Sequence, residues 1–147
     1  MRSEIVRAEM NASGKQYFGG QGRGGAVVVE LAATLPIFLL ILVGTIEATS
    51  MVYLQQSLKI SSYEGSRVSL IPGSDASNVT AACNEILSAR SIRAGIVSIS
   101  PSNFETQPYG TKITVTVQAD CSSNSLFSPW FYAGRSLSAQ TTMMKER

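Results

Sequence analysis

The sequence predicts an α+β fold, in which a long N-terminal transmembrane α-helix is followed by a small domain with one helix on an antiparallel sheet. One apolar segment, residues 26–46, is long enough to cross a bilayer. Helical periodicity continues from it to about Arg67, and beyond that point short alternating segments are separated by turn residues. We therefore expect a cytoplasmic leader of residues 1–25, a helix of residues 26–67 and an extracytoplasmic domain of residues 68–147.

The leader, residues 1–25, is expected to be disordered because it is rich in glycine and has few apolar side chains to bury. Its basic residue nearest the apolar segment is Arg23, and the positive-inside rule then predicts a cytoplasmic N-terminus. Gly20, Gly22 and Gly25 have the spacing of a dinucleotide-binding loop. The strand and amphipathic helix that such a loop needs are missing, so we expect no nucleotide site.

The apolar segment, residues 26–46, contains a single charged residue, Glu30. As a helix the segment would be about 30 Å long, which matches the thickness of a hydrocarbon core. Pro36 is expected to remove one backbone hydrogen bond and to kink the helix locally.

Beyond the apolar segment, Glu47, Met51, Leu54 and Leu58 recur at helical spacing. Such a stripe predicts a packing face, against either the C-terminal domain or another copy of the chain. We interpret Gly65 as the first stop signal, followed by turn residues at Pro72 and Gly73. The helix would then end near Arg67 and be about 60 Å long in all.

The remainder predicts a small domain. Ser74 or Asp75 is a candidate N-cap for a short amphipathic helix that ends at Gly95. Residues 112–119 form the clearest alternating strand, and residues 96–100 and 135–144 are expected to be strands as well.

An aromatic-rich stretch precedes the last expected strand. It contains Phe127, Trp130, Phe131 and Tyr132, which could form a binding patch. We prefer the interpretation that they close one end of a small core.

Two cysteines, Cys83 and Cys121, both follow the apolar segment. If that part of the chain lies outside the cytoplasm, the environment is oxidising and a disulfide is expected, with two buried free thiols as the alternative. The disulfide would close a loop of about forty residues and stabilise the domain by about 3–4 kcal/mol.

The composition argues against several kinds of function. The chain has no histidine, which removes histidine-based triads, general bases and metal ligands. The acidic residues of the C-terminal part are scattered, without a nucleophile or base at a recognisable spacing. A net charge of +2 without a long block of like charge gives no sign of a nucleic-acid surface. We expect no catalytic residues, no metal and no cofactor.

The apolar segment begins with the pattern Gly25-x4-Glu30. If the chain were cut after Gly25, Ala26 would carry a new α-amine with an ordinary pKa of about 7.7–8.0. Glu30, four residues further on, could neutralise the amine of a neighbouring chain and set the axial register of an assembly. The alternative is an interfacial carboxylate that extends to the membrane surface.

These patterns resemble TadE-like proteins, the minor pilins or pseudopilins of Flp/Tad type IVb pilus systems. Gly25-x4-Glu30 resembles the processing site of pilin-like proteins, which a membrane prepilin peptidase cuts. The resemblance extends over the following groups of residues: residues 23–31, Leu35-Pro36, residues 37–43, Gly44, Ile46-Glu47, Tyr53, Gln55-Gln56 and residues 63–67.

The resemblance implies a non-enzymatic protein of pilus assembly in the bacterial inner membrane, with Glu30 and Glu47 at assembly contacts. The implied partners are lipid, other pilin or pseudopilin subunits, the Tad secretion machinery and the peptidase. One alternative is a secreted or tethered enzyme or binding domain behind a signal peptide cut within residues 44–50. Another is an uncleaved single-pass subunit of a different envelope complex.

Overall fold

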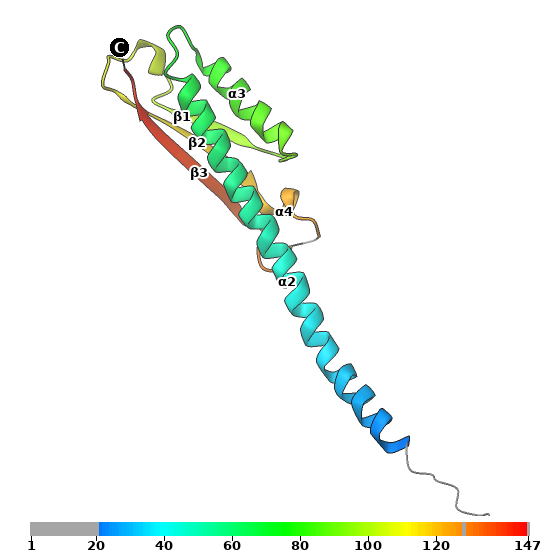
Figure 1. Cartoon of the computed structure of the whole chain (residues 1–147). Coiled ribbons are helices and arrows are strands. Elements are labelled where there is room, and N and C mark those ends of the chain that lie inside the picture. Colours follow the sequence, from blue (N-terminus) through cyan, green and yellow to red (C-terminus); the bar gives the residue numbers. More distant parts are fainter. Residues whose placement is uncertain (1–20, 128, 147) are drawn as a thin grey trace, which may run out of the picture. The chain divides into compact units, whose positions relative to one another are not determined.

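The computed structural model describes residues 21–127 and 129–146. The expected disorder of the leader therefore falls largely on residues outside the described part. The chain divides into two units, Met1–Ile41 and Leu42–Arg147. The elements, coloured along the chain in Figure 1, are α2 (Gln21–Val68), α3 (Ala76–Ala89), β1 (Ile96–Ser100), η1 (Phe104–Thr106), β2 (Lys112–Asp120), α4 (Cys121–Asn124) and β3 (Ser136–Met144).

The predicted fold class is confirmed. A long apolar helix leads into a three-stranded antiparallel sheet of order β1-β2-β3, and α3 is the second long helix of the domain. Helix α2 starts at Gln21, earlier than the expected start at Ala26, and contains Pro36. It also passes through Gly65, so the predicted stop signal at that residue is wrong, and it ends at Val68.

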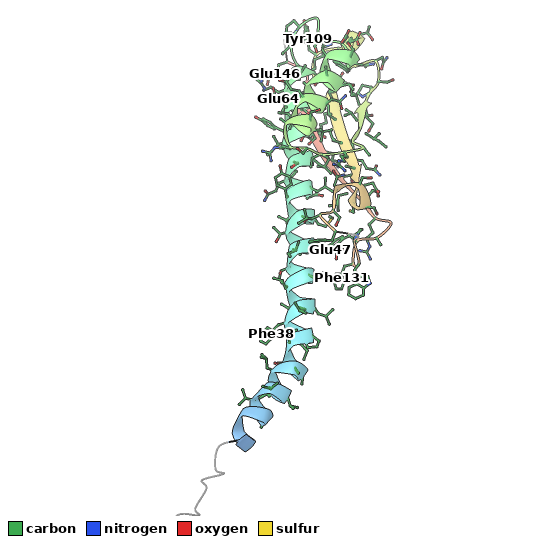
Figure 2. All side chains as sticks on the ribbon, turned by 90° about the vertical axis from the view of Figure 1, so that its right-hand side faces the viewer. Phe38, Glu47, Glu64, Tyr109, Phe131 and Glu146 are labelled. Atoms are coloured by element: carbon green, nitrogen blue, oxygen red, sulfur yellow. The ribbon has the colours of Figure 1, made fainter. Side chains whose placement is uncertain are left out.

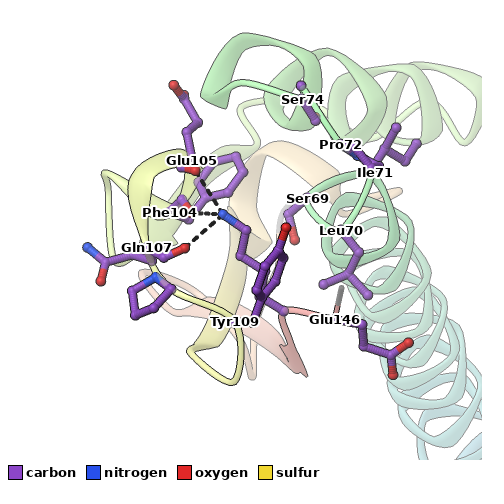
Figure 3. Close-up of a pocket in the computed structure, with 13 residues that line it drawn as sticks. Ser69, Leu70, Ile71, Pro72, Ser74, Phe104, Glu105, Gln107, Tyr109 and Glu146 are labelled. Carbon is purple, nitrogen blue, oxygen red and sulfur yellow. Dashed lines mark hydrogen bonds between the residues drawn. The ribbon is translucent and has the colours of Figure 1, made fainter.

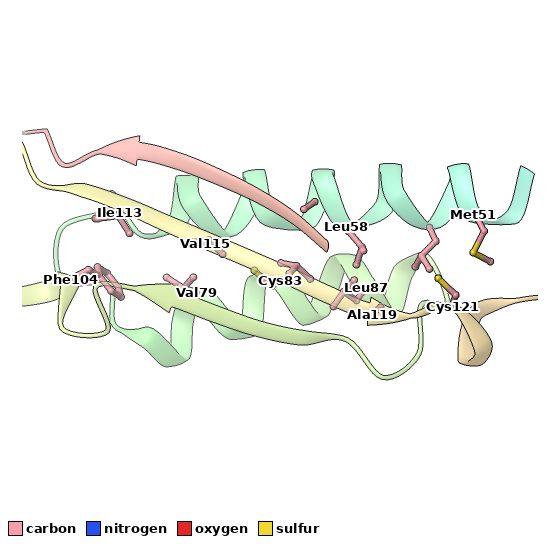
Figure 4. Close-up of a cluster of buried hydrophobic side chains, with 13 residues drawn as sticks. Met51, Leu58, Val79, Cys83, Leu87, Phe104, Ile113, Val115, Ala119 and Cys121 are labelled. Atoms are coloured by element: carbon pink, nitrogen blue, oxygen red, sulfur yellow. The ribbon is translucent and has the colours of Figure 1, made fainter. Parts of the chain in front are cut away.

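The core of the domain lies between the sheet and the two helices (Figure 4). Strand β2 supplies one alternating face, with Ile113, Val115, Val117 and Ala119 buried, because successive side chains of a strand point to opposite sides. Helix α3 contributes Val79, Cys83 and Leu87, which recur at helical spacing. Its N-cap is Asp75, whose carboxylate accepts a hydrogen bond from the amide of Asn78 at 2.8 Å.

Residues 47–68 of α2, here called the domain half of α2, complete this core. Met51, Leu54 and Leu58 are buried, so the predicted stripe packs against the chain's own C-terminal domain. The sequence predicted packing against either the C-terminal domain or another copy of the chain, and the structure shows packing against the domain.

Small polar residues let the domain half of α2 approach its neighbours closely. Ser61 donates a hydrogen bond to the carbonyl of Cys83 on α3 at 3.1 Å. The Ser62 hydroxyl lies 2.9 Å from the Thr141 hydroxyl of β3, and Ser66 donates to the Thr141 carbonyl at 3.1 Å. The three serine hydroxyls are buried and paired, as most buried polar groups are.

Gly65 is required by packing, because α2 passes closest to its neighbours there. A Cβ atom at this position would overlap the Cys83 sulfur and lie 3.2 Å from a methyl group of Val115. Gly95 has a similar role: a Cβ atom there would lie 2.5 Å from Leu87, whereas α3 itself already ends at Ala89. Both glycines were interpreted as helix ends, but the structure shows that they make room for neighbouring side chains.

The disulfide prediction is wrong for this structure, because Cys83 and Cys121 are both free and buried. The Cys83 sulfur packs at Gly65, close to Val115. Cys121 follows Val115 by six positions, which corresponds to about 20 Å along a strand. Figure 4 shows the two side chains at separate places in the core. Burial raises the pKa of both thiols, so they stay protonated.

The thiols can be counted to test this. In the folded chain, purified without reductant, neither cysteine should react with a thiol reagent, and both should react after denaturation. Because the unfolded chain ionises its thiols near pH 8.5 while the folded chain keeps them neutral, stability should decline as the pH rises above that value. If the denatured, unreduced chain showed no reactive thiols, that result would support the disulfide between Cys83 and Cys121 and contradict the free thiols.

Replacing Gly65 tests the close approach of α2 to its neighbours. Gly65→Ala should destabilise the domain by about 1–3 kcal/mol, because overpacking outweighs the better helix propensity of alanine. Gly44→Ala is the matched control, since a Cβ atom there meets only the ring of Phe131 at an ordinary 3.8 Å. Thermal unfolding of the full chain in detergent, followed by circular dichroism, measures both. Equal melting temperatures would contradict the packing role of Gly65.

Candidate functional site

The first part of α2 exposes an apolar surface. Its most apolar 18-residue window has a mean hydropathy of 2.6, and none of that window is buried within the protein. Exposed side chains include those of Leu31, Phe38 and Leu42. The Thr34 hydroxyl in this part is satisfied locally, since it donates to the Glu30 carbonyl at 3.1 Å. By length and composition this helix could cross a membrane.

The predicted processing residues Gly25, Ala26 and Glu30 all lie in the first turns of α2. Ala26 and Glu30 are one turn apart on the same face, and both are exposed. Among the described atoms, a Cβ atom at Gly25 would meet nothing within 4 Å. Packing within the described chain therefore does not require glycine at position 25, in contrast to Gly65.

Glu47 is buried at the start of the domain half of α2, with 6% of its surface exposed. One carboxylate oxygen accepts hydrogen bonds from the amides of Phe131 and Tyr132, each at 2.9 Å. Hydrogen bonds to a charged group contribute about 1.5–3 kcal/mol each. The structure thus gives Glu47 an intramolecular partner that the sequence did not reveal, because the two amides lie more than eighty positions away.

Glu47 holds a segment that we call the aromatic loop, residues 126–131, of which the structure describes all but Ser128. The preferred prediction, that these rings close the core, is wrong for Phe127, Trp130 and Phe131, which are exposed. Only Tyr132, just after the loop, packs against the core. Met51 and Cys121 belong to the core, whereas the three exposed rings of the loop lie outside it.

The last residues of α2 combine a surface ion pair with buried contacts. The Arg67 guanidinium donates two hydrogen bonds to the Glu64 carboxylate and lowers the pKa of that carboxyl. Between these two residues lie Gly65 and Ser66, which contact α3 and β3. The ion pair is exposed and so contributes little stability, whereas Gly65 and Ser66 position the helix on the domain.

A cavity of about 530 Å³ lies at the other end of the domain (Figure 3). On one wall Lys145 donates hydrogen bonds to the backbone carbonyls of Phe104, Glu105 and Gln107 at 3.1, 2.8 and 3.0 Å. These bonds tie the end of the chain to η1. The lining also includes Ser74, whose buried hydroxyl has no hydrogen-bond partner among the described residues. Sequence reasoning missed this cavity, because its lining comes from three separate segments.

The structure therefore groups the predicted site residues in three separate places. Gly25, Ala26 and Glu30 lie together on α2, Glu47 supports the aromatic loop, and the cysteines are core residues. Within residues 21–127 and 129–146, no group of three or more histidine, cysteine, aspartate or glutamate side chains is placed to hold a metal ion.

These features define a class of protein in which one candidate membrane helix continues into a small α+β domain. Residues 25–67 match the family model described as TadE-like protein, which confirms the predicted resemblance. The match covers both the apolar segment and the domain half of α2. No curated protein and no solved structure matches the chain.

The contact between Glu47 and the aromatic loop can be tested by amide hydrogen exchange. Glu47→Ala should greatly speed exchange at Phe131 and Tyr132, because the acceptor of both amides is lost. Glu47→Gln should preserve part of the protection, since an amide oxygen is a weaker acceptor than a carboxylate. Amides of β2, such as Val117, serve as the internal control. Unchanged exchange at Phe131 in Glu47→Ala would contradict the assigned contact.

Proposed function

We propose that this chain is a TadE-like minor pilin or pseudopilin that takes part in Flp/Tad pilus assembly by packing against other subunits. The observation that carries the proposal is the family match, which begins at Gly25 and runs to Arg67 along one continuous helix. The same helix has an exposed apolar part and a part that belongs to the core of a domain. A pilin-like subunit needs both features.

In this proposal α2 crosses the bacterial inner membrane once. Arg23 flanks the apolar segment on its N-terminal side, which favours a cytoplasmic N-terminus and a periplasmic or extracellular domain. The exposed apolar side chains of α2 would contact lipid before assembly and the helices of other pilin or pseudopilin subunits after it.

We further propose that a prepilin peptidase cuts the chain after Gly25. The surroundings of Gly25 support this, because packing within the described chain does not require a glycine there. A recognition role would account for the absence of a side chain. The cut would place a new amine on Ala26, one turn from Glu30, and Glu30 could then pair with the amine of a neighbouring subunit.

For Glu47 we propose an indirect role in assembly. Its carboxylate is engaged with the amides of Phe131 and Tyr132, so it would act by fixing the surface that the aromatic loop presents to neighbours. Glu30 is exposed and is our candidate for a direct contact between subunits.

The cleavage is tested by expressing the full chain with and without a prepilin peptidase and its Tad machinery. The peptidase should shorten the chain to a product that begins at Ala26. Gly25→Leu should abolish the shortening, whereas the neighbouring Gly24→Leu should permit it and serves as the matched control. An equal mass in both strains, or a different mature N-terminus, would contradict the cut.

Carbonate extraction of the same membranes separates the remaining interpretations. A product found only in the soluble periplasmic fraction would favour the secreted domain behind a signal peptide. A full-length chain that stays in the membrane would favour an uncleaved subunit.

A further inference from the structure

The aromatic loop exposes an unusual amount of apolar surface for so short a segment. The exposed fractions are 72% for Leu126, 62% for Phe127, 71% for Trp130 and 63% for Phe131. Isolated exposed apolar residues are ordinary, but a contiguous group of large ones marks an interaction surface. The group also includes tryptophan and phenylalanine, the side chains that bury most area on contact.

The position of the loop is fixed relative to the end of the apolar segment. The Phe131 ring lies 3.8 Å from the place of a Cβ atom at Gly44, and Glu47 binds the amide of Phe131. Leu126 and Phe127 lie with Val43 and Ile46 around a small depression. Figure 2 shows Phe131 close to Glu47, and Tyr109 at the opposite end of the domain. The aromatic loop is thus next to the residues at which α2 would leave the hydrocarbon core.

The chemistry of the loop and its surroundings suits the polar boundary of a bilayer. Residues 121–134 contain no charged side chain. The nearby groove that includes Leu126 is otherwise lined by hydroxyl and amide side chains and by Arg93. Aromatic rings with a polar edge concentrate at the level of the headgroups, and a neighbouring arginine can contact lipid phosphates.

We propose that the aromatic loop is a second membrane contact, with Phe127, Trp130 and Phe131 entering the boundary between headgroups and acyl chains where α2 leaves the bilayer. This inference rests on the membrane span in the proposed function. Because Glu47 ties the loop to α2, the contact would hold the domain at a fixed height above the membrane and restrict its tilt relative to the membrane plane. The occupant of the surface is lipid, and a second protein chain is an outcome that the test can detect.

Trp130 is the single tryptophan of the chain, so its fluorescence reports on the loop directly. The full chain is placed in lipid nanodiscs at about one copy per disc. The lipid is equal parts phosphatidylcholine and phosphatidylglycerol, and a nanodisc leaves both membrane faces open to solvent. Trp130 should emit at a short wavelength and resist quenching by iodide. It should lose most of its emission when the phosphatidylcholine is brominated near the headgroup end of its acyl chains.

The matched control moves the tryptophan to an equally exposed aromatic position at the far end of the domain. In the double variant Trp130→Phe/Tyr109→Trp, the probe replaces a tyrosine that is 66% exposed. It should be quenched by iodide and not by brominated lipid. Far-ultraviolet circular dichroism verifies that both proteins are folded alike.

Two results would overturn the inference while the membrane span stands. One is a chain that co-elutes with the discs while Trp130 stays open to iodide and is unaffected by brominated lipid. The other is protection of Trp130 from both quenchers, which would mean that protein covers the loop. A chain that does not enter the discs would instead contradict the span in the proposed function.

Discussion

The structure depends on the contact between the domain half of α2 and the apolar face of the sheet. Strand β2 buries one alternating row of side chains, and a sheet with an apolar face must be covered. Helix α3 covers part of that face, and Met51, Leu54 and Leu58 of α2 complete the core. The helix that carries the candidate membrane segment is therefore also a core element of the domain. Removing the domain half of α2 would expose the core.

This contact is specified by polar and small residues as much as by apolar ones. Gly65 allows α2 to reach the Cys83 sulfur, and serines on the adjoining turns bond the backbone of α3 and the edge of β3. A buried hydroxyl without a hydrogen-bond partner is costly. The hydrogen bonds of these serines therefore fix the rotation of α2 about its own axis. Glu47 likewise positions the aromatic loop, because its carboxylate accepts hydrogen bonds from two backbone amides.

The residues of the family match include those that pack α2 against the domain. The match ends at Arg67, one residue before α2 ends, and so it includes the residues that contact α3 and β3. Gly65 and Ser66, within the motif of residues 63–67, are docking positions for the domain. The beginning of the match is different, since Gly25 has no comparable packing role among the described atoms. Packing among the described residues thus explains the glycine at position 65 and does not explain the one at position 25.

The sequence by itself determined the fold class, the apolar segment, the strand at residues 112–119 and the packing stripe, because each is a repeat in hydrophobicity along the chain. Local chemistry also placed an N-cap at Ser74 or Asp75, of which the structure uses Asp75. Only the tertiary structure decided that Cys83 and Cys121 stay apart, that Gly65 makes room for a neighbour, and that the aromatic rings face outward over a loop held by Glu47. These outcomes depend on distances between residues far apart in the chain, which periodicity does not record.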